Sequence, residues 1–238
     1  MKKFLVIIPT YNEKENIAEI IDLVLKQDKR IDILVVDDNS PDGTAMIVDK
    51  IVETNERVNI FKRKGKLGLG SAYVEGFHYA IKNEYFAAIE MDADFSHNPE
   101  VLPEMLETSE QFEMVIGSRY KDGVNVVNWS MLRLLLSYGA SKYVNIITGM
   151  PIKDPTGGFN LIRIDLLKSI DIDKIISDGY SFQIEMKYRA YVKNHSIKEI
   201  PIVFTDRKNG ESKMSREIII EAVWMVWRLK YLQLTGRL

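Results

Sequence analysis

The sequence contains no cysteine among its 238 residues. Disulfides, thiolate metal sites and cysteine nucleophiles are therefore excluded, and a location on the reducing, cytoplasmic side of a membrane is favoured. The chain also lacks a strong charge imbalance, because its formal net charge is −2. Such a balance gives no reason to expect nucleic acid as a partner.

Long apolar runs are missing as well. No segment offers the ~20 uninterrupted apolar residues that a membrane-spanning helix requires. The N-terminus starts with Met-Lys-Lys, but only five apolar residues precede Pro9, too few for the core of a signal peptide. We therefore expect residues 4–8 to form a first strand. The three histidines (His78, His97 and His195) show no metal-ligand spacing, and we assign them no role.

The first half of the chain instead shows a regular alternation of strand and helix patterns. The run 31–36 is apolar except for Asp32 and rich in β-branched residues, which is typical of a strand covered on both faces. The alternation predicts an α/β fold with a Rossmann-like, mostly parallel sheet flanked by helices, and ligands outside the carboxyl ends of the strands. Expected strands are 4–8, 31–36, 58–61, 85–91 and 113–117, and expected helices are 13–26, 44–53, 71–82 and 99–111.

The second half has longer apolar helices. We expect helices over 129–148 and 181–193, strands over 159–164 and 197–204, and a polar loop over 205–215 that orders on substrate as a lid. The final segment is strongly apolar but contains Glu221, Arg228 and Lys230, which suits a helix lying in the membrane interface better than a span. We predict a catalytic domain over 1–215 and an amphipathic, membrane-interfacial helix over 216–238, on a protein peripheral to the cytoplasmic membrane face. As an alternative to membrane contact, both apolar helices could pack on the sheet or on a second subunit. A membrane-protein partner also stays open.

Two aspartates one residue apart, Asp92 and Asp94, follow the apolar run 85–91. The two-residue repeat of a strand points both carboxylates to one face, roughly 7 Å apart. Carboxylates that close repel each other unless a cation lies beside them. Oxygen ligands favour Mg²⁺ or Mn²⁺, shared with a phosphate-bearing substrate. The pair therefore predicts a metal site of a nucleotide- or sugar-nucleotide-dependent enzyme, with a plain acidic turn as the alternative.

Further polar groups follow the other expected strands. Because the carboxyl ends of parallel strands meet at one edge of a sheet, we expect these groups to surround one crevice. Each group also has a purely structural alternative. Asn12 and Glu15 could form a helix capping box. Asp37 and Asp38 could be turn formers, and the basic residues 62–66 could be a solvated loop. The groups are Thr10, Tyr11, Asn12 and Glu13; Asp37 and Asp38; the basic and glycine-containing segment 62–70; and Ser118 and Arg119.

Seven motifs stand in one order along the chain, at residues 6–13, 35–44, 66–72, 91–94, 117–119, 154–159 and 206–213. Together they resemble the inverting glycosyltransferases of family 2, which have the GT-A fold. More narrowly, the chain is similar to the polyprenol-phosphate (dolichol-phosphate) mannosyltransferases over residues 4–215. The resemblance implies transfer of mannose from GDP-mannose to the phosphate of a long isoprenoid lipid, with Mg²⁺ or Mn²⁺ as cofactor.

The resemblance also implies roles for individual residues. Donor-binding positions are Pro9, Tyr11, Glu13, Val36, Asp38, Asp92, Ala93, Asp94, Arg119, Arg207 and Lys213. Asp92 and Asp94 are the implied metal ligands, and with Arg119, Arg207 and Lys213 they form the implied catalytic set. The acceptor phosphate is expected at Arg119, Arg133 and Ser137.

Two residues depart from the family pattern. Ser96 stands where some members have a glutamine near the metal, which leaves a third protein ligand open, and Tyr138 replaces a common arginine after Ser137. A lipid monophosphate has a second pKa of about 6 and is mostly dianionic near pH 7, so we predict no dedicated general base. Transfer from UDP-glucose or another nucleotide sugar, and a non-catalytic sugar-nucleotide-binding role, are the alternative functions.

Overall fold

The computed structural model describes residues 1–175, 177–206 and 216–238, with only the backbone of residues 216–222. Its centre is a seven-stranded sheet in the order β3-β2-β1-β4-β7-β5-β8. All neighbouring pairs are parallel except those of β7, which runs antiparallel to both β4 and β5. The predicted mostly parallel α/β sheet is therefore confirmed. The strands are β1 (Phe4–Thr10), β2 (Ile31–Asp37), β3 (Val58–Lys62), β4 (Ala87–Glu90), β5 (Met114–Ser118), β7 (Asn160–Arg163) and β8 (Ile197–Pro201).

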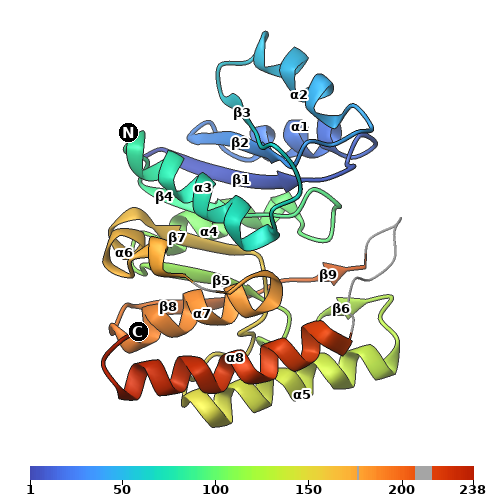
Figure 1. The fold of residues 1–238 in the computed structure, drawn as a ribbon. Coiled ribbons are helices and arrows are strands. Elements are labelled where there is room, and N and C mark those ends of the chain that lie inside the picture. The colour runs from blue at the N-terminus through green and yellow to red at the C-terminus, as the bar shows by residue number, and fades with distance from the viewer. Residues whose placement is uncertain (176, 207–215) are drawn as a thin grey trace.

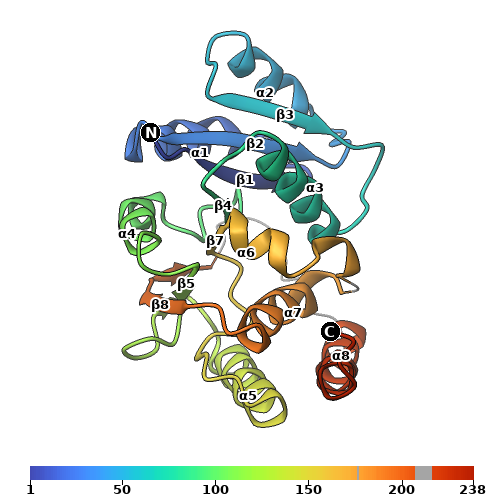
Figure 2. The same ribbon diagram turned by 90° about the vertical axis from the view of Figure 1, so that its left-hand side faces the viewer.

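Helices cover both faces of this sheet (Figures 1 and 2). Alternate residues of β1 feed two separate cores, with Leu5 and Ile7 on one face and Phe4, Val6 and Ile8 on the other. On the first face lie α3 (Leu69–Lys82), α6 (Ile164–Ser169) and α7 (Gly179–Val192), and on the second α1 (Ile17–Gln27), α2 (Thr44–Val52) and α4 (Leu102–Thr108). Short 3₁₀ helices occupy Pro99–Val101 and Ile172–Lys174.

Several expected elements have different bounds in the structure, and the start of α1 is one that bears on the site. Helix α1 begins at Ile17 with Asn16 as its N-cap residue, and Asn12 has a left-handed backbone with φ 63°, so the prediction of an N-cap at Asn12 is wrong. The N–H groups of Asn12 and Glu13 instead donate to Ser40 Oγ and Thr44 Oγ1 in the loop after β2. These long-range bonds satisfy the N–H groups that a helix would otherwise have to cap.

The strand expected at 197–204 is also interrupted. Strand β8 ends at Pro201, and β9 (Phe204–Thr205) pairs in parallel with β6 (Val126–Val127) in a separate two-stranded sheet. Leaving the main sheet brings Phe204 against His97, with ring centroids 5.7 Å apart. The break therefore directs the chain after β8 towards the end of β4.

The two long apolar helices, α5 (Met131–Thr148) and α8 (Arg216–Leu234), lie beyond β8, next to α7. The Tyr143 hydroxyl on α5 donates to the Val223 carbonyl oxygen on α8 at 3.1 Å. Helix α8 buries Met225, Val226 and Leu229 in the core that also contains α7. Within the described residues, we find no helix with the length and apolarity needed to cross a bilayer.

Candidate active site

The acidic pair lies directly after β4, at the carboxyl end of the sheet. Met91 and Ala93 are buried, whereas Asp92 and Asp94 are partly exposed, which places the two carboxylates on the same, open side of the chain. The Asp94 Oδ1 atom accepts a hydrogen bond from the Ser96 N–H at 3.1 Å, which tightens the turn after the pair. Side-by-side placement of the two carboxylates, as expected from their spacing, thus agrees with the burial pattern.

The pair could hold a divalent cation only in an open site, in which the substrate supplies the remaining ligands. Among the residues that the structure describes, no group of three or more His, Asp and Glu side chains is arranged to hold a metal ion. Two carboxylates with further oxygens from a substrate are the usual way in which Mg²⁺ is bound beside phosphates. The buried Ser96 hydroxyl, in the same turn, has no hydrogen-bond partner in the described part of the chain.

His97 holds the backbone of the acidic pair. Its Nδ1 accepts the Asp92 N–H at 3.1 Å, and its ring stacks on Phe159 with centroids 4.8 Å apart. Burial lowers the pKa of His97, against the opposing effect of Asp92 and Asp94. Since Nδ1 is an acceptor, the neutral ring carries its proton on Nε2, which lies 3.9 Å from Asp92 Oδ2. Searching only for metal-ligand spacing missed this role; the position of His97 five residues after Asp92 was the available signal.

Tyr73 of α3 is a second residue that lies close to Asp92. The tyrosine is 1% exposed, and its hydroxyl makes no hydrogen bond of normal geometry within the described residues. Burial and then the carboxylate of Asp92 raise the pKa of Tyr73 well above its usual value. The protonated hydroxyl is thus available as a donor to the Asp92 carboxylate. No sequence pattern pointed to this residue.

The predicted nucleoside positions gather at the ends of β1 and β2. Pro9 and Val36 are register partners in the two strands. Asp38 follows β2 and forms a buried ion pair with Arg63, with Oδ1 and Nη1 3.0 Å apart. Burial raises the pKa of Asp38 despite this neighbouring cation. Tyr11 lies beneath the Lys66 ammonium, 4.6 Å from the ring centroid.

Asp37 has a structural function. Its carboxylate accepts hydrogen bonds from Thr10 Oγ1 at 2.9 Å and from the N–H and hydroxyl of Ser40 at 2.9 and 2.6 Å. For Asp37, the alternative of a turn former is therefore confirmed. Arg63 also donates to the Gly68 carbonyl oxygen and to Ser71 Oγ, which ties Asp38 to the start of α3.

The glycines at the start of α3 are required by packing. Gly68 has φ 100°, and a Cβ atom there would lie 2.1 Å from Asp178 Oδ2. The Gly70 N–H donates to Asp178 Oδ1 at 2.5 Å. Asp178 immediately precedes α7, so the glycine segment fastens α3 to α7 beside the nucleoside positions.

Arg119, predicted in the catalytic, donor and acceptor sets, forms a buried, bidentate ion pair. Its Nε and Nη2 atoms lie 2.7 and 2.6 Å from the two carboxylate oxygens of Asp154, and Nη2 also donates to Thr156 Oγ1 at 2.8 Å. Burial acts to raise the pKa of Asp154, but Arg119 outweighs it and the pKa lies below its usual value. The structure thus gives Arg119 a role in holding the loop 154–158; direct contact with a substrate stays a prediction.

The predicted acceptor residues of α5 lie near Arg119. The Arg133 guanidinium covers the Trp129 ring at 4.2 Å and forms an ion pair with Asp206 at 2.6 Å. Ser137 accepts a hydrogen bond from the Tyr120 hydroxyl at 2.7 Å. The Arg119 guanidinium is 5.5 Å from both the Trp129 and the Tyr120 ring, so the two rings connect the three predicted acceptor residues.

Arg207 and Lys213 lie outside the described residues. The same is true of most of the loop 205–215 that we expect to act as a lid. Tyr138, the departure from the family pattern, packs edge-on against Tyr120 with centroids 5.6 Å apart.

A buried polar network lies beneath the acidic pair. Glu90, at the end of β4, accepts hydrogen bonds from Asn160 at 2.6 Å and from Gln183 at 3.2 Å. Burial raises the pKa of Glu90 to about 7 and lowers that of Lys187, one turn further along α7, to about 8. Buried groups of this kind gave no pattern in the sequence and were missed.

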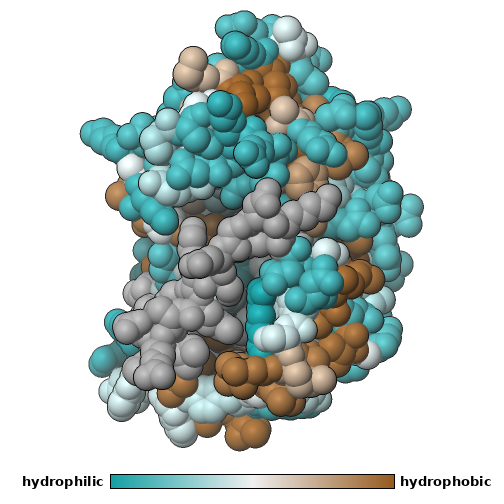
Figure 3. Space-filling model, turned by 90° about the vertical axis from the view of Figure 1, so that its right-hand side faces the viewer, coloured by the Kyte–Doolittle hydropathy of each residue, from teal (hydrophilic) through white to brown (hydrophobic). Residues whose placement is uncertain are grey.

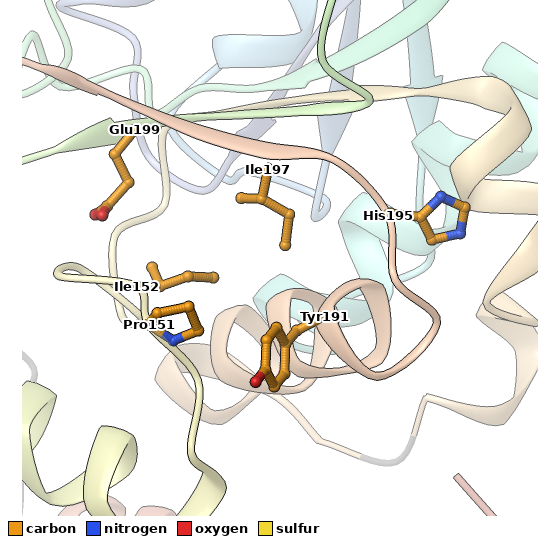
Figure 4. A pocket seen from close by; sticks show the side chains of 6 residues that line it. All are labelled: Pro151, Ile152, Tyr191, His195, Ile197 and Glu199. Carbon is orange, nitrogen blue, oxygen red and sulfur yellow. The ribbon is translucent and has the colours of Figure 1, made fainter.

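A pocket remote from the acidic pair lies beside the start of β8 (Figure 4). Its polar side chains are already engaged, because His195 contacts Glu113 and Ser169, and Glu199 accepts the N–H groups of Lys153 and Asp154. Its lining is formed by Pro151, Ile152, Tyr191, His195, Ile197 and Glu199. These contacts connect the pocket to the structure that supports the loop 154–158.

An acidic pair at the carboxyl end of a mostly parallel sheet, beside the ends of β1 and β2, defines a glycosyltransferase with the GT-A fold. A family model described as "Glycosyl transferase family 2" matches residues 5–171. The chain therefore belongs to glycosyl transferase family 2.

Relatives with assigned names share most of the chain. A polyprenol monophosphomannose synthase of Mycolicibacterium smegmatis is 42% identical over 227 residues, covering 94% of this chain and 86% of the relative. An undecaprenyl-phosphate mannosyltransferase of Micrococcus luteus is 42% identical over 226 residues, covering 95% and 93%. These similarities confirm the resemblance to polyprenol-phosphate mannosyltransferases.

Solved structures support the fold. Glucosyl-3-phosphoglycerate synthase from Mycobacterium tuberculosis, in complex with Mn²⁺, uridine diphosphate and glucosyl-3-phosphoglycerate, superposes with a TM-score of 0.68 at 15% identity. The match covers 99% of this chain and 80% of that chain. At this identity the likeness concerns the fold alone.

Proposed function

We propose that this enzyme transfers mannose from GDP-mannose to a polyprenyl (dolichyl) phosphate, with inversion at the sugar carbon and with Mg²⁺ or Mn²⁺ as cofactor. This is the dolichyl-phosphate β-D-mannosyltransferase type of reaction. The observation that carries the proposal is the pair Asp92 and Asp94, both partly exposed on one side of the chain and positioned by His97. Relatives at 42% identity that are named for polyprenol-phosphate mannosylation support the choice of sugar and acceptor.

The acidic pair has a defined part in this reaction. Asp92 and Asp94 would hold the cation, which would neutralise the nucleoside diphosphate as it leaves. His97 and Tyr73 then fix the orientation of Asp92, His97 through its backbone and Tyr73 through its carboxylate. We assign Arg207 and Lys213 to the same leaving diphosphate, as donors that face developing charge.

We assign the donor nucleoside to the ends of β1 and β2. The proposed contacts are Pro9, Tyr11, Glu13, Val36, Asp38 and Ala93. The Asp38 Oδ1 atom is buried and makes no hydrogen bond of normal geometry among the described residues, although Arg63 lies 3.0 Å away. A buried acceptor of this kind favours a ligand N–H donor, such as one from a nucleobase.

Arg119, Arg133 and Ser137 form the proposed acceptor-phosphate site, with Arg119 also near the donor. The phosphate is largely dianionic near pH 7, because its second pKa is about 6, so the reaction needs no general base. In the inverting step, one phosphate oxygen forms a bond to the sugar carbon. The bond from that carbon to the diphosphate breaks, and its electron pair leaves with GDP.

An isoprenoid acceptor also requires a contact with the membrane. We propose that α5 and α8 lie on the cytoplasmic face of a membrane, with residues 1–215 as the catalytic domain and 216–238 as the interfacial helix. Apolar side chains gather on the lower part of the face drawn in Figure 3. The exposed apolar residues of the two helices are Met131, Leu132, Leu135, Leu136, Tyr138, Ile146, Val223, Trp224, Trp227, Tyr231 and Leu234.

One assay tests the proposed reaction. Radiolabelled GDP-mannose and UDP-glucose are each offered with dolichyl phosphate and with undecaprenyl phosphate, in the presence of Mn²⁺ or of a chelator. We expect a mannosyl lipid from GDP-mannose that disappears with the chelator. A glucosyl lipid from UDP-glucose would replace the donor assignment, and failure to label any polyprenyl phosphate would refute the proposed function.

A further inference from the structure

The loop 154–158 is held from two sides by charged groups of other elements. On one side, its Asp154 carboxylate is bound by Arg119 from the end of β5. Glu199 of β8 accepts the N–H groups of Lys153 and Asp154, each at 2.9 Å. The ion pair and the two hydrogen bonds to Glu199 fix the start of the loop, although the loop belongs to no helix or strand.

On the other side, Lys187 of α7 holds two carbonyl oxygens of the loop. Its ammonium group donates to Gly157 O at 2.5 Å and to Pro155 O at 3.3 Å, and the lysine is fully buried. Asn160 adds a hydrogen bond to Gly157 O at 3.1 Å. Both carbonyl groups therefore point towards α7.

The direction of these carbonyl groups sets the direction of the next two amides. In a trans peptide the C=O and the following N–H point in opposite directions, and the structure contains no cis peptide in its described residues. The N–H groups of Thr156 and Gly158 therefore point away from Lys187. Pro155 and Gly157 are buried, whereas Thr156 and Gly158 are half-buried, so these two amides face the more open side.

Neither amide is used inside the protein. The N–H groups of Thr156 and Gly158 donate no hydrogen bond to any residue that the structure describes. A buried or half-buried N–H without a partner is costly unless a ligand or water satisfies it. Two neighbouring amides that point the same way form a concave site for anionic oxygen.

The surroundings place this amide pair between the acceptor residues and the acidic pair. Thr156 Oγ1 accepts a hydrogen bond from Arg119, one of the three proposed acceptor residues. A Cβ atom at Gly158 would be 3.8 Å from His97 Cε1, the ring that binds the Asp92 N–H. The residues that carry the two amides thus contact both groups of residues.

We propose that the backbone N–H groups of Thr156 and Gly158 bind the phosphate of the acceptor, and that Lys187 is the positioning residue that aims them. This proposal rests on the proposed function for the identity of the phosphate. Holding two phosphate oxygens at the loop leaves a third to form the bond to the sugar carbon, while the electron pair of the broken bond leaves with the nucleoside diphosphate. No proton needs to be transferred in this step.

Amide chemical shifts test the binding site directly. The isotopically labelled full chain is titrated with citronellyl phosphate, a short isoprenoid monophosphate, and the amide signals of residues 156 and 158 are followed. We expect both amide protons to move downfield saturably, since an N–H that donates to an anion is deshielded. Binding that moves other signals but leaves these two unchanged, or no binding at all, overturns the proposal.

Substitution of Lys187 tests its positioning role. Lys187→Met leaves the buried network with an extra negative charge, so the charge-balanced double variant Glu90→Gln/Lys187→Met is used beside it. In the double variant we expect the KM for citronellyl phosphate to rise about tenfold or more. This is the loss of affinity that follows when one hydrogen bond to a charged group is lost. The affinity for GDP with Mn²⁺ should stay within about twofold of wild type, which is a smaller change than the loss of one hydrogen bond to a charged group would cause.

Lys193→Met, at the exposed C-cap residue directly after α7, is the matched lysine control and should behave as wild type. A folded double variant with the wild-type acceptor KM and unchanged signals from residues 156 and 158 overturns the role of Lys187. A wrong proposed function would be recognised by a different outcome. The wild-type enzyme would then label no polyprenyl phosphate in the transfer assay, independently of the amide signals.

Discussion

Helices α1 and α5 place the same kinds of side chain in opposite environments. The 11-residue α1 buries all of Ile17, Ile20, Ile21 and Val24 against the sheet. The 18-residue α5 buries only Ser141, Val144 and Thr148, while Leu132 and Leu135 are 68% and 61% exposed. In the N-terminal half, which contains the proposed nucleoside contacts (the donor half), the apolar residues of α1 form the core. In the C-terminal half, which contains the proposed acceptor residues of α5 (the acceptor half), many apolar residues remain on the surface.

Under the proposed function, this difference is expected, because the two halves would meet different partners. The donor half presents polar groups at strand ends and buries the apolar face of α1, although single apolar residues such as Met46 and Phe61 are exposed. Helices α5 and α8 expose leucines, tryptophans and tyrosines, and a contiguous apolar surface marks an interaction site. An acceptor with a charged head and an apolar tail would need both kinds of surface.

The largest expected effect concerns the acidic pair. Asp94→Ala should lower turnover about 1,000-fold, because removing a group that stabilises the leaving charge costs two to three orders of magnitude. Binding to vesicles should not change, since α5 and α8 are untouched. The measurement is radiometric transfer together with calorimetry of GDP with and without Mn²⁺. Turnover within about tenfold of wild type, or nucleotide binding indifferent to a chelator, would contradict the metal role.

The buried ion pair beneath the site should show the next effect. Asp154→Asn leaves Arg119 without its counterion and should lower the free energy of unfolding by about 3–5 kcal/mol at pH 7. The folded pKa of Asp154 is below its usual value, so its stabilising effect is complete above about pH 4 and is lost as the pH falls through the folded pKa.

Urea unfolding between pH 7 and pH 3 measures this dependence. The difference between wild type and Asp154→Asn should shrink as the pH falls below about 4. Asp49→Asn, at a surface ion pair with Lys62, is the control and should cost about 1 kcal/mol or less. A difference between wild type and Asp154→Asn that is constant with pH would mean that the ion pair is not its source.

A pair of alanine substitutions tests the contrast between the helices themselves. Ile20→Ala in α1 should lower the free energy of unfolding by about 2–5 kcal/mol, because it leaves a cavity in the core. Leu135→Ala in α5 should change it by about 0.5 kcal/mol or less, as expected for an exposed position. Urea denaturation measures both, and equal costs would show that α5 is covered in solution.

The smallest expected effect is on membrane binding. Replacing Trp224 and Trp227 of α8 by serine should weaken binding to vesicles containing anionic lipid about tenfold, since binding follows the apolar area inserted. The exposed apolar residues Met46 and Phe61 of the donor half, replaced by serine in the same way, are the control. Vesicle sedimentation and light scattering are the measurements. If wild type forms a dimer that the tryptophan variant loses, and neither binds vesicles, the surface serves a second subunit.

Patterns of short range were predictable from the chain alone. Runs such as 31–36, the alternation of strands and helices and the placement of Asp92 and Asp94 at a strand end depend on residues close in sequence. The start of α1 was predicted wrongly because Asn12 and Glu13 bond to side chains of the loop after β2, about 30 residues away. The strand at 159–164 was predicted, but nothing in the sequence indicated that β7 runs antiparallel to its neighbours β4 and β5.

Other parts of the site were decided by distant contacts. Arg119 meets Asp154 across 35 residues, and Glu90 meets Gln183 across 93. The type and spacing of residues do not predict such partners. Whether a charged side chain is buried and paired depends on elements that only folding brings together. Order and polarity along the chain were enough for the class of enzyme and its acidic motif. The contacts of His97, Tyr73 and Lys187 form only where the sheet and the helices bury these side chains.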